Sequence, residues 1–361
     1  MSEPIISVIT STYNDGPYLR EAVDSILNQT FTDFEYIIVD DASTDETPQI
    51  LASYDDPRIV VLRNEENLGR GGARNRAIEK ARGEYIAIMD GDDVSMLDRF
   101  EKQIEYLVSH PEIEYLGSGI QYISGAGGFF PGVWKVPETP GAISWLLCFT
   151  YPFIHSTTMA RRSIFDRFGL YNPAFLRSQD MELWSRILPE IKCANLPAQL
   201  LKVRVKISNR DFQLPDTSYA RRVHHQYNEK ILGRNIPKEI SNILWNTSQK
   251  DQDQNSVPIS TTDAISAMKT LVQLYEAMDR QEIISRSEES FIQEDLIIRA
   301  SKIITNDKFF SMEFLGSSKT LRKSHYLTWR YRYRPQLARI LNICLQNPKL
   351  ALQLLRKRIQ G

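Results

Sequence analysis

The sequence predicts an α/β fold, in which flanking helices cover a mostly parallel sheet, followed by a mainly helical C-terminal region. Two observations support this prediction. In the first hundred residues, short apolar runs alternate with segments whose apolar residues recur at helical spacing. Strands that are apolar on both faces and alternate with helices are typical of a parallel sheet covered on two sides. From about residue 218 onward, helical patterns dominate.

The individual elements follow from local patterns. Apolar residues from Leu19 to Leu27 have helical spacing, a cluster of capping residues near Ser43–Asp45 begins a second helix, and residues 70–82 form a third. The four predicted strands are Ile5–Ile9, Tyr36–Val39, Ile59–Leu62 and Tyr85–Met89.

Polar segments follow all four predicted strands. Because the carboxyl ends of parallel strands meet at one edge of a sheet, and ligands bind beyond that edge, we expect a binding cleft there. The four segments are Thr10–Asn14, Asp40–Ser43, Asn64–Arg70 and Asp90–Asp93.

The run Asp90–Asp93 is the strongest chemical signal. Three carboxylates within four residues repel one another unless a cation lies among them. Oxygen ligands favour Mg²⁺ or Mn²⁺, which would neutralise the charge of a departing diphosphate. Gly91 allows a tight turn. The alternative is an acidic turn that caps the following helix, and Asp93 is expected to lie at that helix start.

Two further segments have both a chemical and a structural interpretation. Asp40 could accept hydrogen bonds from a base or ribose, whereas Ser43 and Asp45 next to it suit helix capping. The glycine-rich, basic stretch Asn67–Asn75 precedes a helix, so its amides, Arg70 or Arg74 could hold an anion.

Asp180 lies at the start of a predicted helix. It could be a general base for an acceptor hydroxyl, although an acidic residue is common at a helix N-terminus for electrostatic reasons alone. We interpret His155, His224 and His225 as structural or surface residues unless the fold brings them to the cleft.

Composition and charge limit the other possibilities. The 361 residues contain no uninterrupted apolar run long enough for a membrane span, and the N-terminus does not resemble a leader. Three widely spaced cysteines favour a reducing cytoplasm.

Residues 317–361 carry a charge of +11 and the remainder −12. This basic amphipathic tail with aromatics predicts either peripheral contact with an anionic membrane surface or packing on the acidic body. No other feature indicates a nucleic-acid partner.

Taken together, the segments resemble inverting glycosyltransferase family 2, whose members have the GT-A fold and use nucleotide-diphospho-sugar donors. The resemblance covers roughly residues 4–205 and is densest in the first hundred. The matching segments are Ser7–Asn14, Ser25–Thr30, Val39–Asp45, Asn67–Gly69, Ala73–Asn75, Gly83–Ile86 and Asp90–Asp93.

The resemblance implies a role for each matching site residue. Asp92 would bind the divalent cation, Mg²⁺ or Mn²⁺, that bridges the diphosphate, and Asp180 would be the catalytic base. The donor-binding residues would be Thr10, Ser11, Tyr13, Asp40, Arg74, Asp90 and Gly91. Of these, Asp40 would face the nucleobase of the donor, and Asp90 would contact its ribose or sugar.

Two positions depart from the family pattern. Gln179 replaces the first residue of the usual Glu-Asp pair, and Lys206 stands where the Arg-x-His segment has its histidine. We therefore transfer the base role to Asp180 but no metal-ligand role to Lys206. The resemblance implies transfer of a sugar to a hydroxyl acceptor (sugar, lipid-linked glycan or protein), in polysaccharide or glycoconjugate synthesis.

Two rival interpretations remain. Asp90-x-Asp92 after an apolar strand also resembles the nucleophile motif of haloacid-dehalogenase-like phosphatases, and a non-catalytic GT-A scaffold is a second alternative. The predicted organisation is a GT-A catalytic domain at 1–215, a helical extension at 216–316 and the basic amphipathic segment at 317–361.

Overall fold

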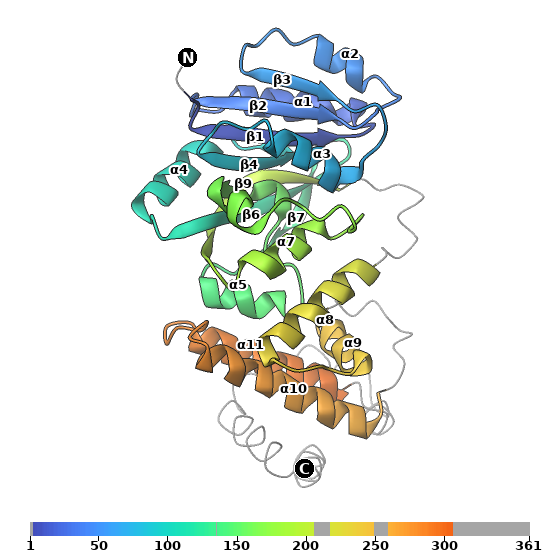
Figure 1. The fold of residues 1–361 in the computed structure, drawn as a ribbon, viewed down its shortest axis with the longest axis vertical. Coiled ribbons are helices and arrows are strands. Elements are labelled where there is room, and N and C mark those ends of the chain that lie inside the picture. Colours follow the sequence, from blue (N-terminus) through green and yellow to red (C-terminus); the bar gives the residue numbers. More distant parts are fainter. Residues whose placement is uncertain (1–2, 135, 206–216, 249–258, 306–361) are drawn as a thin grey trace. The chain divides into compact units, whose positions relative to one another are not determined.

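The computed structural model describes residues 3–134, 136–205, 217–248 and 259–305 (Figure 1). In this part of the chain, one sheet contains the strands in the order β3-β2-β1-β4-β8-β6-β9-β5, and β7 pairs with β6. Lys206 and the basic tail 317–361 lie wholly outside the described residues.

The first half of the sheet is the predicted parallel one, in the order β3-β2-β1-β4. Its strands are β1 (Ile6–Thr12), β2 (Phe34–Asp40), β3 (Ile59–Arg63) and β4 (Tyr85–Asp90). The helices between them are α1 (Gly16–Leu27), α2 (Thr47–Ala52) and α3 (Gly69–Ile78). All four strands therefore end at the same edge, where the polar segments follow.

The second half of the sheet is mixed. β8 is antiparallel to both β4 and β6, β9 is parallel to β6, and β5 pairs antiparallel with β9. This last pairing brings the end of β9 beside the turn that follows β4. The elements are β5 (Val94–Ser95), α4 (Arg99–Ser109), β6 (Ile113–Ser124), β7 (Phe129–Trp134), α5 (Pro140–Leu147), the 3-10 helix η1 (His155–Thr157), β8 (Met159–Arg161), α6 (Ser163–Phe168), α7 (Gln179–Ile187) and β9 (Lys192–Val205).

The two faces of the parallel half have different partners. Alternate residues of each strand point to opposite faces. Ile6 and Val8 of β1, with Tyr85, Ala87 and Met89 of β4, join α1 and α4 in one hydrophobic core. The alternating positions, which include Ser11 and Asp90, therefore belong to the other face, where α3 packs on β1 and β2.

The C-terminal helices form part of a second compact unit. The first unit contains residues 1–147 and 151–223, and the second contains Cys148–Thr150 together with the chain from His224 onward. The boundary predicted at 215 falls among residues that are not described, so it stays a prediction. No helix of the described residues is long and apolar enough to cross a membrane. The helices are α8 (Ser218–Leu232), α9 (Lys238–Asn246), α10 (Thr261–Arg280) and α11 (Glu289–Thr305).

Phe100 of α4 tests how much of the stability comes from the core on this face. Its side chain is fully buried, so we expect Phe100→Ala to lower the free energy of unfolding by about 3–5 kcal/mol. Val108 on the same helix is 67% exposed, and Val108→Ala should change the free energy of unfolding by less than about 0.5 kcal/mol. Denaturant titration of both variants measures the difference; equal losses would contradict the packing described here.

Candidate functional site

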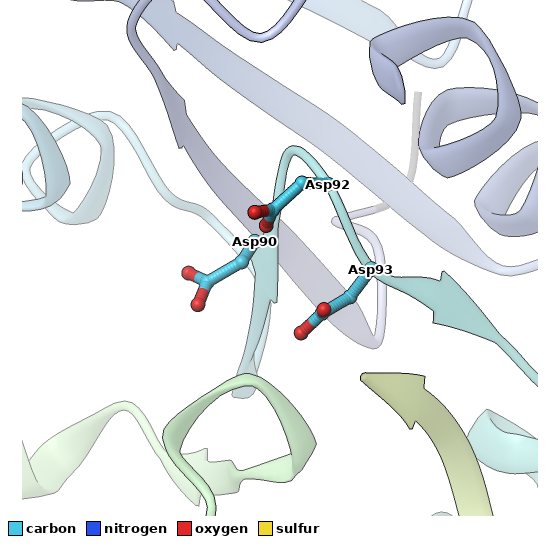
Figure 2. Close-up of side chains that lie close together, drawn as sticks. All are labelled: Asp90, Asp92 and Asp93. Carbon is cyan, nitrogen blue, oxygen red and sulfur yellow. The ribbon is translucent and has the colours of Figure 1, made fainter. Parts of the chain in front are cut away.

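The turn after β4 brings three carboxylates together. Oxygens of Asp90, Asp92 and Asp93 all lie within 4.8 Å of one another, and Figure 2 shows the side chains projecting to a common side of the turn. Asp90 and Asp92 are half-buried, whereas Asp93 is buried. The sequence prediction that this run forms a compact acidic cluster at the end of β4 agrees with this geometry.

Asp90 forms an ion pair with Arg74 of α3. An Nη2 hydrogen of Arg74 is donated to Oδ1 of Asp90 at 2.6 Å, and the Arg74 side chain is only 2% exposed. Burial acts to raise the pKa of Asp90, but the nearby guanidinium groups of Arg74 and Arg70 outweigh it and hold that pKa below its ordinary value. Asp90 is therefore an anion whose charge is compensated from α3.

Asp93 has a structural role in this geometry. Its Oδ2 accepts a hydrogen bond from Ser156 at 2.7 Å, and its Oδ1 accepts one from the Arg204 backbone N–H at 3.0 Å. Burial, and then the charges of Asp90 and Asp92, raise the pKa of Asp93 to about 8. The expectation that Asp93 starts a helix is wrong, because it precedes strand β5, and α4 begins only at Arg99.

Arg204 holds the acidic turn in place from β9. Its Nε donates to the backbone oxygen of Asp92 at 2.9 Å, and its Nη2 donates to Glu21 of α1 at 2.5 Å. Nη1 reaches the backbone oxygens of Ser124 and Gly125, at the end of β6. One buried guanidinium thus connects α1, the end of β6 and the turn that carries Asp92.

Helix α3 also positions the segment that leads to Asp180. The Asn75 side chain donates to the backbone oxygen of Tyr171 and accepts from its N–H, at 2.8 and 2.9 Å. A side chain at Gly71 would lie 3.7 Å from Gln179, so α3 packs directly against the start of α7. Ser178 has a φ of 56°, the left-handed turn from which α7 begins.

Asp180 is electrostatically connected with the Arg74–Asp90 pair. Burial raises the pKa of Asp180 above its ordinary value, although the Met181 amide and the charge of Arg74 oppose the rise. The carboxyl accepts a hydrogen bond from the Met181 N–H at 2.8 Å. A carboxylate with a raised pKa is better matched to proton abstraction near neutral pH.

His155 lies beside the site rather than apart from it. Its Nε2 is 2.8 Å from the Tyr171 hydroxyl, and its ring makes edge contacts with Tyr171 and Trp184. Burial, followed by the charge of Arg74, lowers the pKa of His155 far below its ordinary value. His155 is therefore a neutral, buried neighbour of Arg74, and sequence spacing contained no signal for this position.

The donor-side residues of β1 point in different directions. Ser11 lies opposite Asp90 in the sheet register, and its buried hydroxyl has no hydrogen-bond partner among the described residues. Tyr13 is 49% exposed. Thr10 is fully buried and its hydroxyl lies 3.0 Å from that of Tyr36, on the core face. Ser11 and Tyr13 therefore stay candidates for the donor side, whereas the Thr10 side chain faces the core.

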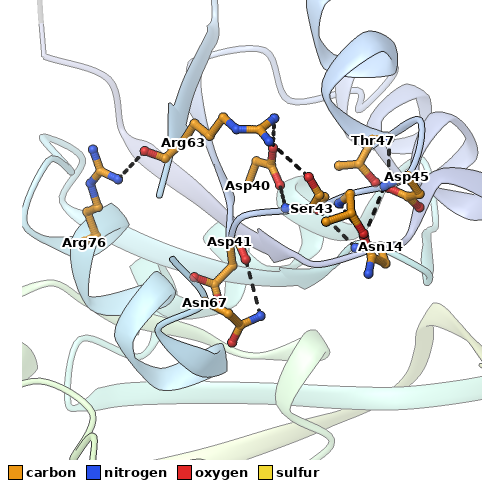
Figure 3. A network of polar contacts seen from close by, with 10 residues as sticks. Asn14, Asp40, Asp41, Ser43, Asp45, Thr47, Arg63, Asn67 and Arg76 are labelled. Atoms are coloured by element: carbon orange, nitrogen blue, oxygen red, sulfur yellow. Dashed lines mark hydrogen bonds and ion pairs between the residues drawn. The ribbon is translucent and has the colours of Figure 1, made fainter. Parts of the chain in front are cut away.

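Asp40 is held in a network of loop contacts, shown in Figure 3. Its Oδ1 accepts the Ser43 N–H at 2.9 Å, and its Oδ2 pairs with Arg63 at 2.9 Å. Asn14 and Asp45 link the loops after β1 and β2 through further backbone hydrogen bonds. Each oxygen of the Asp40 carboxylate can accept a second hydrogen bond. The segment can therefore both hold the loop and contact a nucleobase or ribose.

Asp15 is a carboxylate of the site that the sequence interpretation missed. A side chain at Gly91 would lie 3.1 Å from Oδ2 of Asp15 and 3.2 Å from the Thr12 hydroxyl. Gly91 thus leaves room for the loop after β1 to approach the acidic turn. The position of Asp15, three residues after the strand end, gave no motif that could identify it.

The residues of the turn fit a divalent cation. Asp90 and Asp92 present hard oxygen atoms of the kind that Mg²⁺ and Mn²⁺ prefer, whereas the Asp93 oxygens already accept protein hydrogen bonds. We therefore expect Asp92 to carry the main ligand role, with Asp90 beside it.

Arg204 should control cation binding through the shape of the turn. We expect Arg204→Met to weaken Mn²⁺ binding about tenfold and to lower the free energy of unfolding by about 1–3 kcal/mol, because Glu21 and the Asp92 carbonyl lose their donor. Lys192→Met, an exposed change at the far end of β9, is the control. Calorimetric Mn²⁺ titration checks this; wild-type affinity in Arg204→Met would contradict it.

Comparisons with known proteins identify the family of this chain. The family model described as glycosyl transferase family 2 matches residues 7–169. An uncharacterised glycosyltransferase of Methanocaldococcus jannaschii is 37% identical over 220 residues, 58% of this chain and 73% of the relative. The Escherichia coli UDP-Glc:alpha-D-GlcNAc-diphosphoundecaprenol beta-1,3-glucosyltransferase WfaP is 30% identical over 244 residues, 65% of this chain and 86% of the relative.

A solved structure has the same fold. S. aureus TarS, residues 1–349 in complex with UDP-GlcNAc, aligns with a TM-score of 0.57 and 18% sequence identity, over 85% of this chain and 92% of that chain. This likeness confirms the predicted GT-A fold. With the identity and coverage of its relatives, this chain belongs to glycosyltransferase family 2 and is a glycosyltransferase.

Proposed function

We propose that this glycosyltransferase moves a sugar from a nucleotide-diphospho-sugar to an acceptor hydroxyl by a single displacement with inversion. Asp180 takes the proton of the acceptor hydroxyl, whose oxygen attacks the anomeric carbon on the side opposite the diphosphate. The bond from the anomeric carbon to the diphosphate oxygen breaks, and the nucleoside diphosphate leaves. A transition state with oxocarbenium character is typical of such transfers.

One observation carries this proposal: a half-buried carboxylate with a raised pKa, Asp180, lies within electrostatic reach of the same Arg74 that binds Asp90. The proposed base Asp180 and the proposed donor-binding residue Asp90 thus both interact electrostatically with Arg74, although 90 residues separate them in the chain. This arrangement suits an acceptor hydroxyl that must lie between the base and the donor.

The donor site is proposed at the carboxyl ends of β1 and β4. The Ser11 hydroxyl lies beside Asp90 and has no hydrogen-bond partner in the part of the chain that the structure describes. The exposed ring of Tyr13 suits stacking on a nucleobase. Asp40 is proposed to face the nucleobase of the donor, and Asp90 is proposed to contact its ribose or sugar. Gly91 keeps the backbone of the turn open to the donor.

A divalent cation, Mg²⁺ or Mn²⁺, is proposed at Asp92. When bound, it would neutralise the developing charge of the leaving diphosphate. The protein holds the turn that carries Asp92 in place. The Arg204 side chain donates to the Asp92 carbonyl, and the Asp93 carboxylate accepts hydrogen bonds from Ser156 and from the Arg204 backbone amide.

The acceptor is proposed to be a hydroxyl of a growing glycoconjugate. The name of WfaP describes transfer from UDP-Glc to a GlcNAc carried on diphosphoundecaprenol. By analogy, a lipid-linked glycan is the first acceptor class to test here. The reaction is proposed to belong to polysaccharide or glycoconjugate synthesis.

The two rival interpretations are less well supported. A haloacid-dehalogenase-like phosphatase would use Asp90 as a nucleophile, but here Arg74 binds that carboxylate, and the chain belongs to a glycosyltransferase family. A scaffold without activity would not need Asp180 beside the acidic turn.

A donor panel with an Asp180 variant tests the function. Wild type should release nucleoside diphosphate from one nucleotide-sugar only with Mg²⁺ or Mn²⁺, and Asp180→Asn should lose about 10²–10⁴-fold in acceptor transfer, because the base is gone. Asp166→Asn, an exposed change on α6, should keep wild-type turnover. Near wild-type transfer by Asp180→Asn would refute the base assignment. Silence of the wild type across the panel would favour the scaffold, and phosphatase activity alone the phosphatase.

The basic tail gives a second prediction. We propose that residues 317–361, with a charge of +11, hold the protein against the anionic inner face of the cytoplasmic membrane, near a lipid-linked acceptor. The full chain should float with vesicles containing anionic lipid, and a chain ending at residue 316 should not. Neutral vesicles are the control. Equal binding by both chains would contradict the membrane role and favour packing of the tail on the body.

A further inference from the structure

Arg70 is a cation of the site that the proposed function leaves unused. It lies in the first turn of α3, four residues before Arg74, so the two side chains share one face of the helix. Arg74 on this face reaches Asp90 at 2.6 Å. Arg70 therefore points toward the same group of carboxylates from one turn nearer the helix N-terminus.

The surroundings of Arg70 are strongly acidic. The charge of Asp90 raises the pKa of Arg70 above its ordinary value, against the partial desolvation of the guanidinium by the neighbouring residues, and Asp92, Asp15 and Asp180 add to the rise. The packing of Gly71 against Tyr171 and Gln179 fixes this end of α3 between the acidic turn and α7. Four carboxylates from three different segments, the turn after β4, the loop after β1 and the start of α7, thus act electrostatically on one guanidinium.

Arg70 differs from Arg74 in how it is held. Arg74 is buried and bound to Asp90, whereas Arg70 is exposed and makes no direct ion pair with any described residue. A long, exposed arginine without a fixed partner can change its rotamer at little cost. Its position is therefore set by the net charge of the site.

Ligand binding changes the electrostatic interactions of Arg70 in opposite directions. A divalent cation at Asp92 and Asp90 would repel the guanidinium, because like charges in a shared acidic site oppose each other. A diphosphate would attract it, since a guanidinium binds phosphate oxygens through paired N–H donors.

We propose that Arg70 binds the diphosphate of the nucleotide donor and opposes divalent-cation binding when no diphosphate is present. This inference rests on the proposed donor site. Its consequence is a positive coupling: the diphosphate draws Arg70 away from the carboxylates, so cation and donor bind more tightly together than apart. Arg70 is thus a donor-binding residue that also sets the order in which the site is loaded.

Opposite shifts in two binding measurements test the proposal on the full chain. Mn²⁺ alone is titrated by electron paramagnetic resonance, and UDP and GDP are titrated by calorimetry at saturating Mn²⁺. Arg70→Met should tighten Mn²⁺ binding about threefold to tenfold and weaken diphosphate binding about tenfold. Arg70→Lys, which keeps the charge, should stay near wild type for Mn²⁺ alone.

Arg20→Met is the matched control. Arg20 is an exposed arginine of α1 whose guanidinium lies over the Tyr54 ring and donates to Ser53, so its loss changes net charge equally without touching the site. Arg20→Met should leave both affinities within about twofold of wild type.

The outcomes separate this proposal from the proposed function. If Arg70→Met binds Mn²⁺ no more tightly than wild type, or binds the diphosphate equally well, the role of Arg70 is refuted, whatever the donor panel shows. If the wild type binds neither diphosphate with Mn²⁺, both the donor site and the role of Arg70 are refuted. Expected shifts in binding with a silent donor panel would leave Arg70 supported and refute only the transfer reaction.

Discussion

The buried ion pair between Arg74 and Asp90 is the interaction on which the site depends. Two nitrogens of Arg74, Nε and Nη1, are buried with no hydrogen-bond partner among the described residues, so Asp90 is the main compensation for this charge. Removing one partner of a buried pair leaves the other charge uncompensated, at a cost of about 3–5 kcal/mol. The pair therefore fixes α3 against the end of β4.

A fixed α3 determines where the other groups lie. Asn75 holds the backbone of Tyr171 through two hydrogen bonds, and Gly71 allows close packing against Gln179, next to Asp180. From the opposite side, Arg204 anchors the carbonyl of Asp92. The base candidate and the cation candidate are thus positioned by separate arginines, each buried and each bound to the acidic turn.

Much of this arrangement could be predicted from the sequence, and the exceptions have physical causes. The order of apolar runs predicted the parallel sheet, whose strands end at a common edge that carries Ser11, Asp40 and Asp90. Strand alternation places Thr10 on the core face, where its hydroxyl meets that of Tyr36. Asp15 could not be predicted, because only the turn at Gly91 brings it to the acidic turn. Arg204 is the arginine of the segment compared with the Arg-x-His pattern, but its contact with the acidic turn depends on the antiparallel β5–β9 pairing and could not be predicted.

The central claim is that Asp180 activates an acceptor on the side of the sugar opposite the diphosphate. The most direct measurement is the anomeric configuration of the product, read by proton NMR from the donor that the enzyme uses. An α-linked nucleotide-sugar should give a β-linked product from the first turnover. A product that keeps the α configuration would contradict single displacement and, with it, the assignment of Asp180 as the base.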